Sequence, residues 1–117
     1  MNFDLTDCAR RILEFRDRRD WKRFHTPKNL AVSISIEAAE LLELFQWKDS
    51  NDTVLPDQEN ARAAVEDEIA DIAIYLLLLC ADQEVDLRKA IERKITKNDD
   101  HYPVNKARGR ADKYTKL

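Results

Sequence analysis

Glycine is nearly absent from this sequence: there is one among 117 residues, together with only three prolines. A β-rich domain needs many tight turns, which glycine usually supplies, so its scarcity favours a helical protein. Cysteine is scarce as well. Cys8 and Cys80 fall on the apolar faces of predicted helices, so we expect free thiols in a reducing cytoplasm rather than a disulfide.

Long hydrophobic runs are also missing. The longest uncharged stretch, Ile72 to Ala81, has about half of the roughly 20 residues that a membrane crossing needs. No basic region leads into an apolar stretch at the N-terminus, so no secretion signal is predicted. The net charge of -3 gives no general attraction for nucleic acid. We therefore expect a soluble, cytoplasmic protein that binds neither a membrane nor a nucleic acid polymer.

Apolar periodicity predicts four helices in a single domain of residues 1–117, with an all-α, four-helix bundle-like fold. The predicted helices run from about Asp4 to Asp20, Pro27 to Lys48, Asp57 to Gln83 and Leu87 to Asn98. Asp49 to Pro56 is predicted to be an exposed loop. From about Asp99 the chain is basic and lacks periodicity, so an irregular tail is expected.

The third predicted helix is apolar on nearly every side from Ile69 to Ala81, apart from Asp71. Such helices are usually enclosed by neighbours, and a lone bundle of this length has too few helices to cover it. We therefore expect a homodimer or a dimer of dimers.

Two carboxylate pairs, Glu37 with Glu40 and Glu68 with Asp71, have i, i+3 spacing, which places each pair on one helix face. Both pairs lie among Leu, Ile and aromatic residues. A single such pair is usually a solvated face, but two inward pairs are costly unless a positive charge compensates them. Since the Lys and Arg residues of these helices are not placed to do so, a bound cation is the simplest interpretation.

These pairs provide only carboxylate oxygens as metal ligands. Such ligands favour Mg²⁺, with Mn²⁺ second, whereas zinc prefers His or Cys and a di-iron site would need a Glu-x-x-His motif that is missing. About four carboxylates could hold more than one metal ion and activate a water against a phosphoryl group. The pattern therefore favours hydrolysis of a phosphoric anhydride.

Phosphate and base contacts must come from side chains, because the sequence has no P-loop. Candidate phosphate-binding residues within reach in sequence are Lys94, Asn98 and Tyr102. Aromatic candidates for contact with a nucleobase are Trp21, Trp47, Tyr75 and His25. Each of these residues also has a purely structural interpretation. Tryptophans are more often core or interface residues, and Lys94 could be an ordinary surface lysine.

The residues around the acidic pairs resemble the MazG-like all-α nucleoside triphosphate pyrophosphohydrolases, and within them the dCTP pyrophosphatase branch. The resemblance is carried by Trp21-x-x-Phe24-His25-x-Pro27-Lys28-Asn29-Leu30, Glu37-Ala38-Ala39-Glu40-Leu41-Leu42-Glu43-Leu44-Phe45-Gln46-Trp47, Glu68-x-x-Asp71-x-x-x-Tyr75 and Lys94-x-x-x-Asn98-x-x-x-Tyr102-Pro103-Val104. The family often has a glycine within the first acid pair, where this chain has Ala38 and Ala39.

The resemblance implies Mg²⁺-dependent hydrolysis of a deoxynucleoside triphosphate between the α and β phosphates, as nucleotide pool house-cleaning. It implies that the four carboxylates bind metal, that Trp21, His25, Trp47 and Tyr75 line the base and sugar pocket, and that Lys94 and Asn98 meet the phosphates. It also implies a helical homodimer or homotetramer.

Two other hypotheses remain open at the level of sequence. One is a non-catalytic helical module that binds nucleotide or metal, and the other is an oligomeric adaptor whose acids form salt bridges between subunits. Within the enzyme hypothesis, either Glu43 or Asp67 is a candidate for orienting the attacking water.

Overall fold

The computed structural model describes residues 1–48 and 59–117. The predicted loop from Asp49 to Pro56 therefore lies outside the described residues. The described part of the chain contains helices and no strand, which confirms the all-α prediction. It divides into two compact units, Met1–Glu84 and Val85–Leu117, and each unit is described by itself. A single domain over residues 1–117 stays a prediction.

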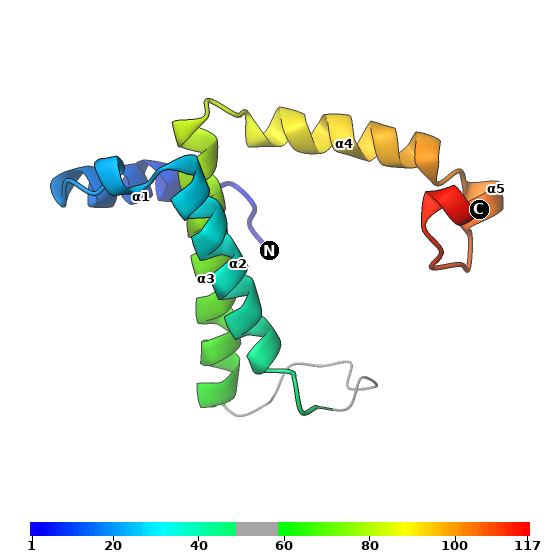
Figure 1. Ribbon diagram of the computed structural model, residues 1–117, viewed down its shortest axis with the longest axis horizontal. Coiled ribbons are helices and arrows are strands. Elements are labelled where there is room, and N and C mark those ends of the chain that lie inside the picture. Colours follow the sequence, from blue (N-terminus) through cyan, green and yellow to red (C-terminus); the bar gives the residue numbers. More distant parts are fainter. Residues whose placement is uncertain (49–58) are drawn as a thin grey trace. The chain divides into compact units, whose positions relative to one another are not determined.

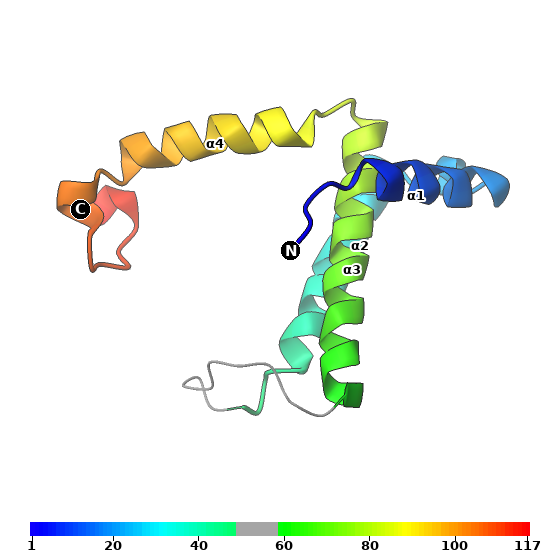
Figure 2. The same cartoon turned by 180° about the vertical axis from the view of Figure 1, so that it is seen from behind.

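The described residues of the first unit form three α-helices and one 3-10 turn. These elements are α1 (Thr6–Arg18), η1 (Lys22–Phe24), α2 (Pro27–Glu43) and α3 (Glu59–Asp82). Helices α2 and α3 lie side by side (Figure 1). Helix α1 lies across the end of that pair where α2 begins and α3 ends, as both views show (Figures 1 and 2).

Helix α2 begins as the sequence predicts. Pro27 occupies its first turn, and the Thr26 Oγ1 accepts a hydrogen bond from the Asn29 N–H at 3.2 Å. The helix ends at Glu43, short of the predicted Lys48. Beyond Glu43 the backbone changes to turns closed by bonds between residues three apart, such as Phe45 N–H to the Leu42 carbonyl at 3.0 Å.

Helix α1 ends in a Schellman motif that positions the following tryptophan. Asp20 adopts a left-handed conformation with φ of 54°, and its N–H donates to the Asp17 carbonyl at 3.1 Å. The Trp21 N–H donates to the Arg16 carbonyl, also at 3.1 Å. The apolar contact that often accompanies this motif is made by the Trp21 ring, which packs edge-on against Phe15 at 5.7 Å. Trp21 is therefore held against the last turns of α1.

The fully buried apolar core of the described chain is small. Its members, one on α2 and two on α3, are Leu30, Val65 and Leu78. By contrast, several large apolar side chains of the same two helices are exposed, namely Val32, Ile36, Ile69 and Leu76. A considerable apolar surface of α2 and α3 is thus open to solvent in the single chain.

The second unit contains α4 (Leu87–His101), α5 (Val104–Ala107) and the 3-10 turn η2 (Tyr114–Lys116). The Asp86 side chain caps α4 by accepting a hydrogen bond from the Lys89 N–H at 3.0 Å. The chain after about Asp99 is more regular than expected: α4 continues to His101, and two short helical turns, α5 and η2, follow.

The physical end signal of α4 is Pro103 rather than the loss of apolar periodicity. A proline disfavours helical geometry in the residue before it, and Tyr102 accordingly has φ of -123° and ψ of 63°. The His101 ring stacks on Tyr114 with centroids 4.1 Å apart, which ties the tail back to the end of α4. Among the helices of the described residues, none is both long enough and apolar enough to cross a membrane.

Candidate functional site

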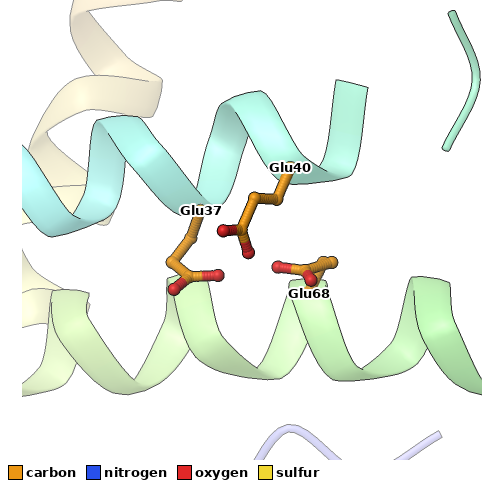
Figure 3. Close-up of side chains that lie close together, drawn as sticks. All are labelled: Glu37, Glu40 and Glu68. Atoms are coloured by element: carbon orange, nitrogen blue, oxygen red, sulfur yellow. The ribbon is translucent and has the colours of Figure 1, made fainter. Parts of the chain in front are cut away.

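Three glutamates converge between α2 and α3. Glu37 and Glu40 share one face of α2 because they are three residues apart, and Glu68 approaches them from α3 (Figure 3). One carboxylate oxygen from each lies within 4.8 Å of the others. The side-by-side packing of the two helices therefore brings Glu68 to an acid pair that lies far from it in the sequence.

The charges of this group are not compensated by protein cations. None of the ion pairs among the described residues involves Glu37, Glu40 or Glu68. Moreover, the Oε2 atoms of Glu37 and Glu68 are buried without a hydrogen-bond partner in the described part of the chain. Buried polar atoms are usually satisfied, so these two oxygens, when both carboxylates are ionised, call for either a proton shared between them or a bound cation.

Crowding of the carboxylates raises two of their pKa values. The pKa of Glu37 is raised chiefly by a hydrogen bond to Glu68, which forms while Glu37 holds a proton, and then by burial and by the charges of Asp71 and Glu68. The pKa of Glu40 is raised by a hydrogen bond to Glu37 and by the charge of that neighbour, then by burial. The group therefore retains a positive species, either a proton or a cation, more readily than isolated glutamates do.

The donor set fits a hard divalent ion, because it consists of carboxylate oxygens alone. Oxygens that share one Mg²⁺ at its usual bond length lie roughly 3–4 Å apart. The observed spacing, within 4.8 Å, approaches that range, so small side-chain rotations would close the three oxygens around one ion. This acidic group could hold a metal ion.

Asp71, the fourth predicted ligand, is not a member of this close group. It is half-buried on α3, and its charge is near enough to raise the pKa of Glu37. Asp71 also lines a groove of about 810 Å³ formed with α1. The structure thus brings together three of the four predicted carboxylates and puts the fourth at the wall of an adjoining groove.

The groove gathers three of the four predicted base-contacting residues. Trp21, His25 and Tyr75 all line it, with Phe15 beside them. The His25 ring lies edge-on to Trp21 with centroids 6.4 Å apart, and its Nδ1 is buried without a hydrogen-bond partner in the described chain. Aromatic and aliphatic side chains supply most of the wall surface, as in other small-molecule sites, and several charged residues, including four arginines, also line it.

The remaining predicted site residues lie elsewhere. Trp47 follows the end of α2, is 90% exposed, and is not part of the groove lining. Lys94 and Asn98 are exposed and four residues apart on α4, and Tyr102 caps the same helix. These last three belong to the second unit, so their contact with phosphates stays a prediction.

The sequence reasoning missed Arg16, which lines the groove and is only 9% exposed. A signal for it was available in the helical periodicity. Arg16 follows Leu5, Ala9 and Ile12 at helical spacing, which puts a cation on the apolar stripe of α1. Arginine is uncommon at an apolar-face position of this kind.

The comparisons with known proteins agree with the all-helical fold of the described residues. Residues 32–117 match the MazG-like family, and the chain belongs to that family. The resemblance inferred from the sequence motifs is therefore confirmed.

Individual proteins within this similarity are dCTP pyrophosphatases and a solved pyrophosphatase. The chain is 44% identical to dCTP pyrophosphatase 1 of Rattus norvegicus and 41% identical to that of Homo sapiens, in each case over 97% of this chain and 67% of the relative. A crystal structure of a pyrophosphatase from Archaeoglobus fulgidus is 46% identical, with a TM-score of 0.75 over 88% of this chain and 95% of that protein.

Proposed function

We propose that this protein hydrolyses a deoxynucleoside triphosphate, dCTP or a related pyrimidine nucleotide, to the monophosphate and pyrophosphate in nucleotide pool house-cleaning. The class of enzyme follows from the relatives, which are dCTP pyrophosphatases and a solved pyrophosphatase. The chain is a nucleoside triphosphate pyrophosphohydrolase. The observation that carries the proposal is a group of three uncompensated glutamates next to an aromatic groove.

In this proposal Glu37, Glu40 and Glu68 hold Mg²⁺, for which Mn²⁺ could substitute, and Asp71 completes the set from the groove wall. The bound ion would lower the pKa of a coordinated water and offset charge on the phosphoryl oxygens. The three glutamates act by fixing the site of attack against the substrate's phosphates. Either Glu43 or Asp67 would orient the water and take its proton.

The groove would orient the rest of the nucleotide. Trp21, His25 and Tyr75 offer ring faces and edges for the base and sugar, and stacking of this kind is worth about 1–3 kcal/mol per base. Trp47 of this or a second copy would add a further ring. Lys94 and Asn98, with Tyr102, would contact the phosphates. The cytoplasmic location remains a prediction from the sequence.

A homo-oligomer forms part of the proposal. The exposed apolar side chains of the helix pair, Val32, Ile36, Ile69 and Leu76, need a cover that the single chain does not provide. A second copy of the chain is the expected cover, in a homodimer or homotetramer. The alternative of a non-catalytic binding module is not favoured, because the relatives are named as enzymes.

Pyrophosphate release from a panel of nucleoside triphosphates tests the function. We expect release with Mg²⁺, fastest from dCTP. Glu40→Gln or Asp71→Asn should lower kcat/KM by about 100-fold or more, since loss of even an outer-shell metal partner costs 10–100-fold. The helical circular dichroism spectrum should be unchanged.

Glu66→Gln is the matched control, because Glu66 is 63% exposed on α3 and pairs only with Arg62 at 3.4 Å among the described ion pairs. It should retain wild-type turnover. Full activity in both Glu40→Gln and Asp71→Asn would exclude the proposed site, and no release from any nucleotide by the wild type would exclude the proposed reaction.

A further inference from the structure

Arg16 is the buried charged residue of the described chain. Its side chain is 10% exposed, and its Nε donates to the Asp17 Oδ1 at 2.8 Å. Asp17 itself is 58% exposed, so the buried cation is paired with an acid that remains in solvent. Arginine is seldom this buried, and its terminal nitrogens, which are not among the fully buried unpaired atoms, remain accessible to a further acceptor.

The guanidinium keeps unused donors. Arginine has five N–H donors in a planar fork and no acceptor. The bond to Asp17 uses the Nε donor, and the two terminal nitrogens make no hydrogen bond with any described residue. Arg11, Arg18 and Arg19 also line the groove, but all three are exposed to water. Arg16 is thus the least exposed of the groove arginines, and its terminal donors have no partner among the described residues.

The backbone holds Arg16 beside the aromatic wall. Because the Trp21 N–H bonds the Arg16 carbonyl at 3.1 Å, the Schellman motif fixes the two residues as one unit. Arg16 lines the same groove as Trp21, His25 and Tyr75, so a base stacked on these rings would share one cavity with its donor fork. The partnerless Nδ1 of His25 is a second polar atom at the same wall.

A guanidinium, which presents only hydrogen-bond donors, can distinguish pyrimidine bases by the donors and acceptors at their O2 and N3 positions. Cytosine carries two adjacent acceptors, O2 and N3. Uracil and thymine carry the O2 acceptor next to an N3–H donor, which would oppose a guanidinium N–H. The groove, at about 810 Å³, is within the range of ordinary ligand pockets.

We propose that Arg16 is a specificity-determining residue that donates its terminal N–H groups to O2 and N3 of cytosine and thereby selects cytosine over uracil and thymine nucleotides. This inference rests on the proposed function for the identity of the substrate. In this inference Arg16 determines which base binds, whereas a role in phosphate binding would affect all triphosphates alike.

The test is the ratio of kcat/KM for dCTP to kcat/KM for dUTP in the wild type, Arg16→Gln and Arg10→Gln. Glutamine offers one donor and one acceptor side by side, which matches uracil. Arg16→Gln should therefore lower the ratio by about 10-fold or more, the usual size of one bidentate base contact. Arg10→Gln is the control: Arg10 is 58% exposed on the same helix and outside the groove lining, so the ratio should stay at the wild-type value.

Binding of dCMP and dUMP without metal, measured by calorimetry, separates base reading from catalysis. We expect the same shift in the ratio of Kd values. A wild type that shows no preference for cytosine in either assay overturns the inference, as does an Arg16→Gln variant that weakens both bases equally. If the wild type hydrolyses no triphosphate, the proposed reaction fails, and the monophosphate binding ratio alone decides the role of Arg16.

Arg16→Lys covers the case in which Arg16→Gln does not fold. Lysine keeps the charge but not the planar fork, so cytosine should lose about 10-fold while uracil is little affected. Equal losses for both bases would assign Arg16 to structure alone.

Discussion

Glu68→Gln should change thermal stability in opposite directions without and with Mg²⁺. In the metal-free protein, the substitution removes one of three carboxylates whose oxygens lie within 4.8 Å of one another. Mutual repulsion then falls, so the melting temperature should rise. In the presence of Mg²⁺ the same variant lacks one of its ligands, so the gain in melting temperature from the ion should shrink.

The size of the effect follows from binding linkage. Mg²⁺ at 100 times its Kd adds about 2.7 kcal/mol to the free energy of unfolding of the wild type. For a domain of about this length that corresponds to a shift of roughly 10 °C. Loss of a direct ligand should weaken binding by about 100-fold or more, since even an outer-shell partner is worth 10–100-fold. At the same Mg²⁺ concentration the variant should then gain only about 0.4 kcal/mol, or 1–3 °C.

Differential scanning fluorimetry of chelator-treated protein, with and without Mg²⁺, measures both shifts. Glu66→Gln, two residues earlier on α3 and exposed, is the control and should keep the wild-type Mg²⁺ shift. Isothermal calorimetry supplies the Kd values. A Glu68→Gln protein that retains the full Mg²⁺ shift would refute the assignment of the three-glutamate group as the metal site.

Two further outcomes are expected. The metal-free fold should lose stability as the pH rises from the ordinary glutamate pKa, about 4.3, through the raised pKa values of Glu37 and Glu40, because the native state binds more protons than the unfolded chain in that window. Urea unfolding at several pH values measures this slope, and an unchanged slope in Glu40→Gln would contradict the stated cause. Leu30→Ala should lower the free energy of unfolding by about 2–5 kcal/mol, since Leu30 is 1% exposed in the α2–α3 core. Leu42→Ala, on the same helix but 65% exposed, should change it by only about 0.5 kcal/mol or less; chemical denaturation compares the two, and equal losses would mean that Leu30 does not anchor the pair.

Local chemistry was sufficient to predict the helices and most of their starts. Thr26 with Pro27, and Asp86, are short-range signals for helix starts, and Thr26 and Asp86 cap α2 and α4. Helix ends were harder, because they depend on local bonds that periodicity does not report. The end of α4 was missed for this reason: the polar residues after Asn98 continue the helix until Pro103 approaches.

The carboxylate group shows what spacing can and cannot predict. An i, i+3 pair must share a face of its own helix, so Glu37 and Glu40 were certain to lie together once α2 formed. Which residue of the second pair meets them depends on how α3 is rotated and shifted against α2. The spacing of the pair does not determine that register. In the structure Glu68 joins the group of three glutamates, whereas Asp71 lines the groove.

Arg16 illustrates the complementary limit. A pattern search for inward acids or aromatic residues passes over an arginine, because long cationic side chains on an apolar stripe usually extend to reach water. The structure nevertheless leaves only 9% of Arg16 exposed. The turn that follows α1 folds Trp21 back on the carbonyl of Arg16 and against Phe15, and all three residues line the groove. Helical periodicity alone does not report this burial, which makes Arg16 a candidate for reading the substrate.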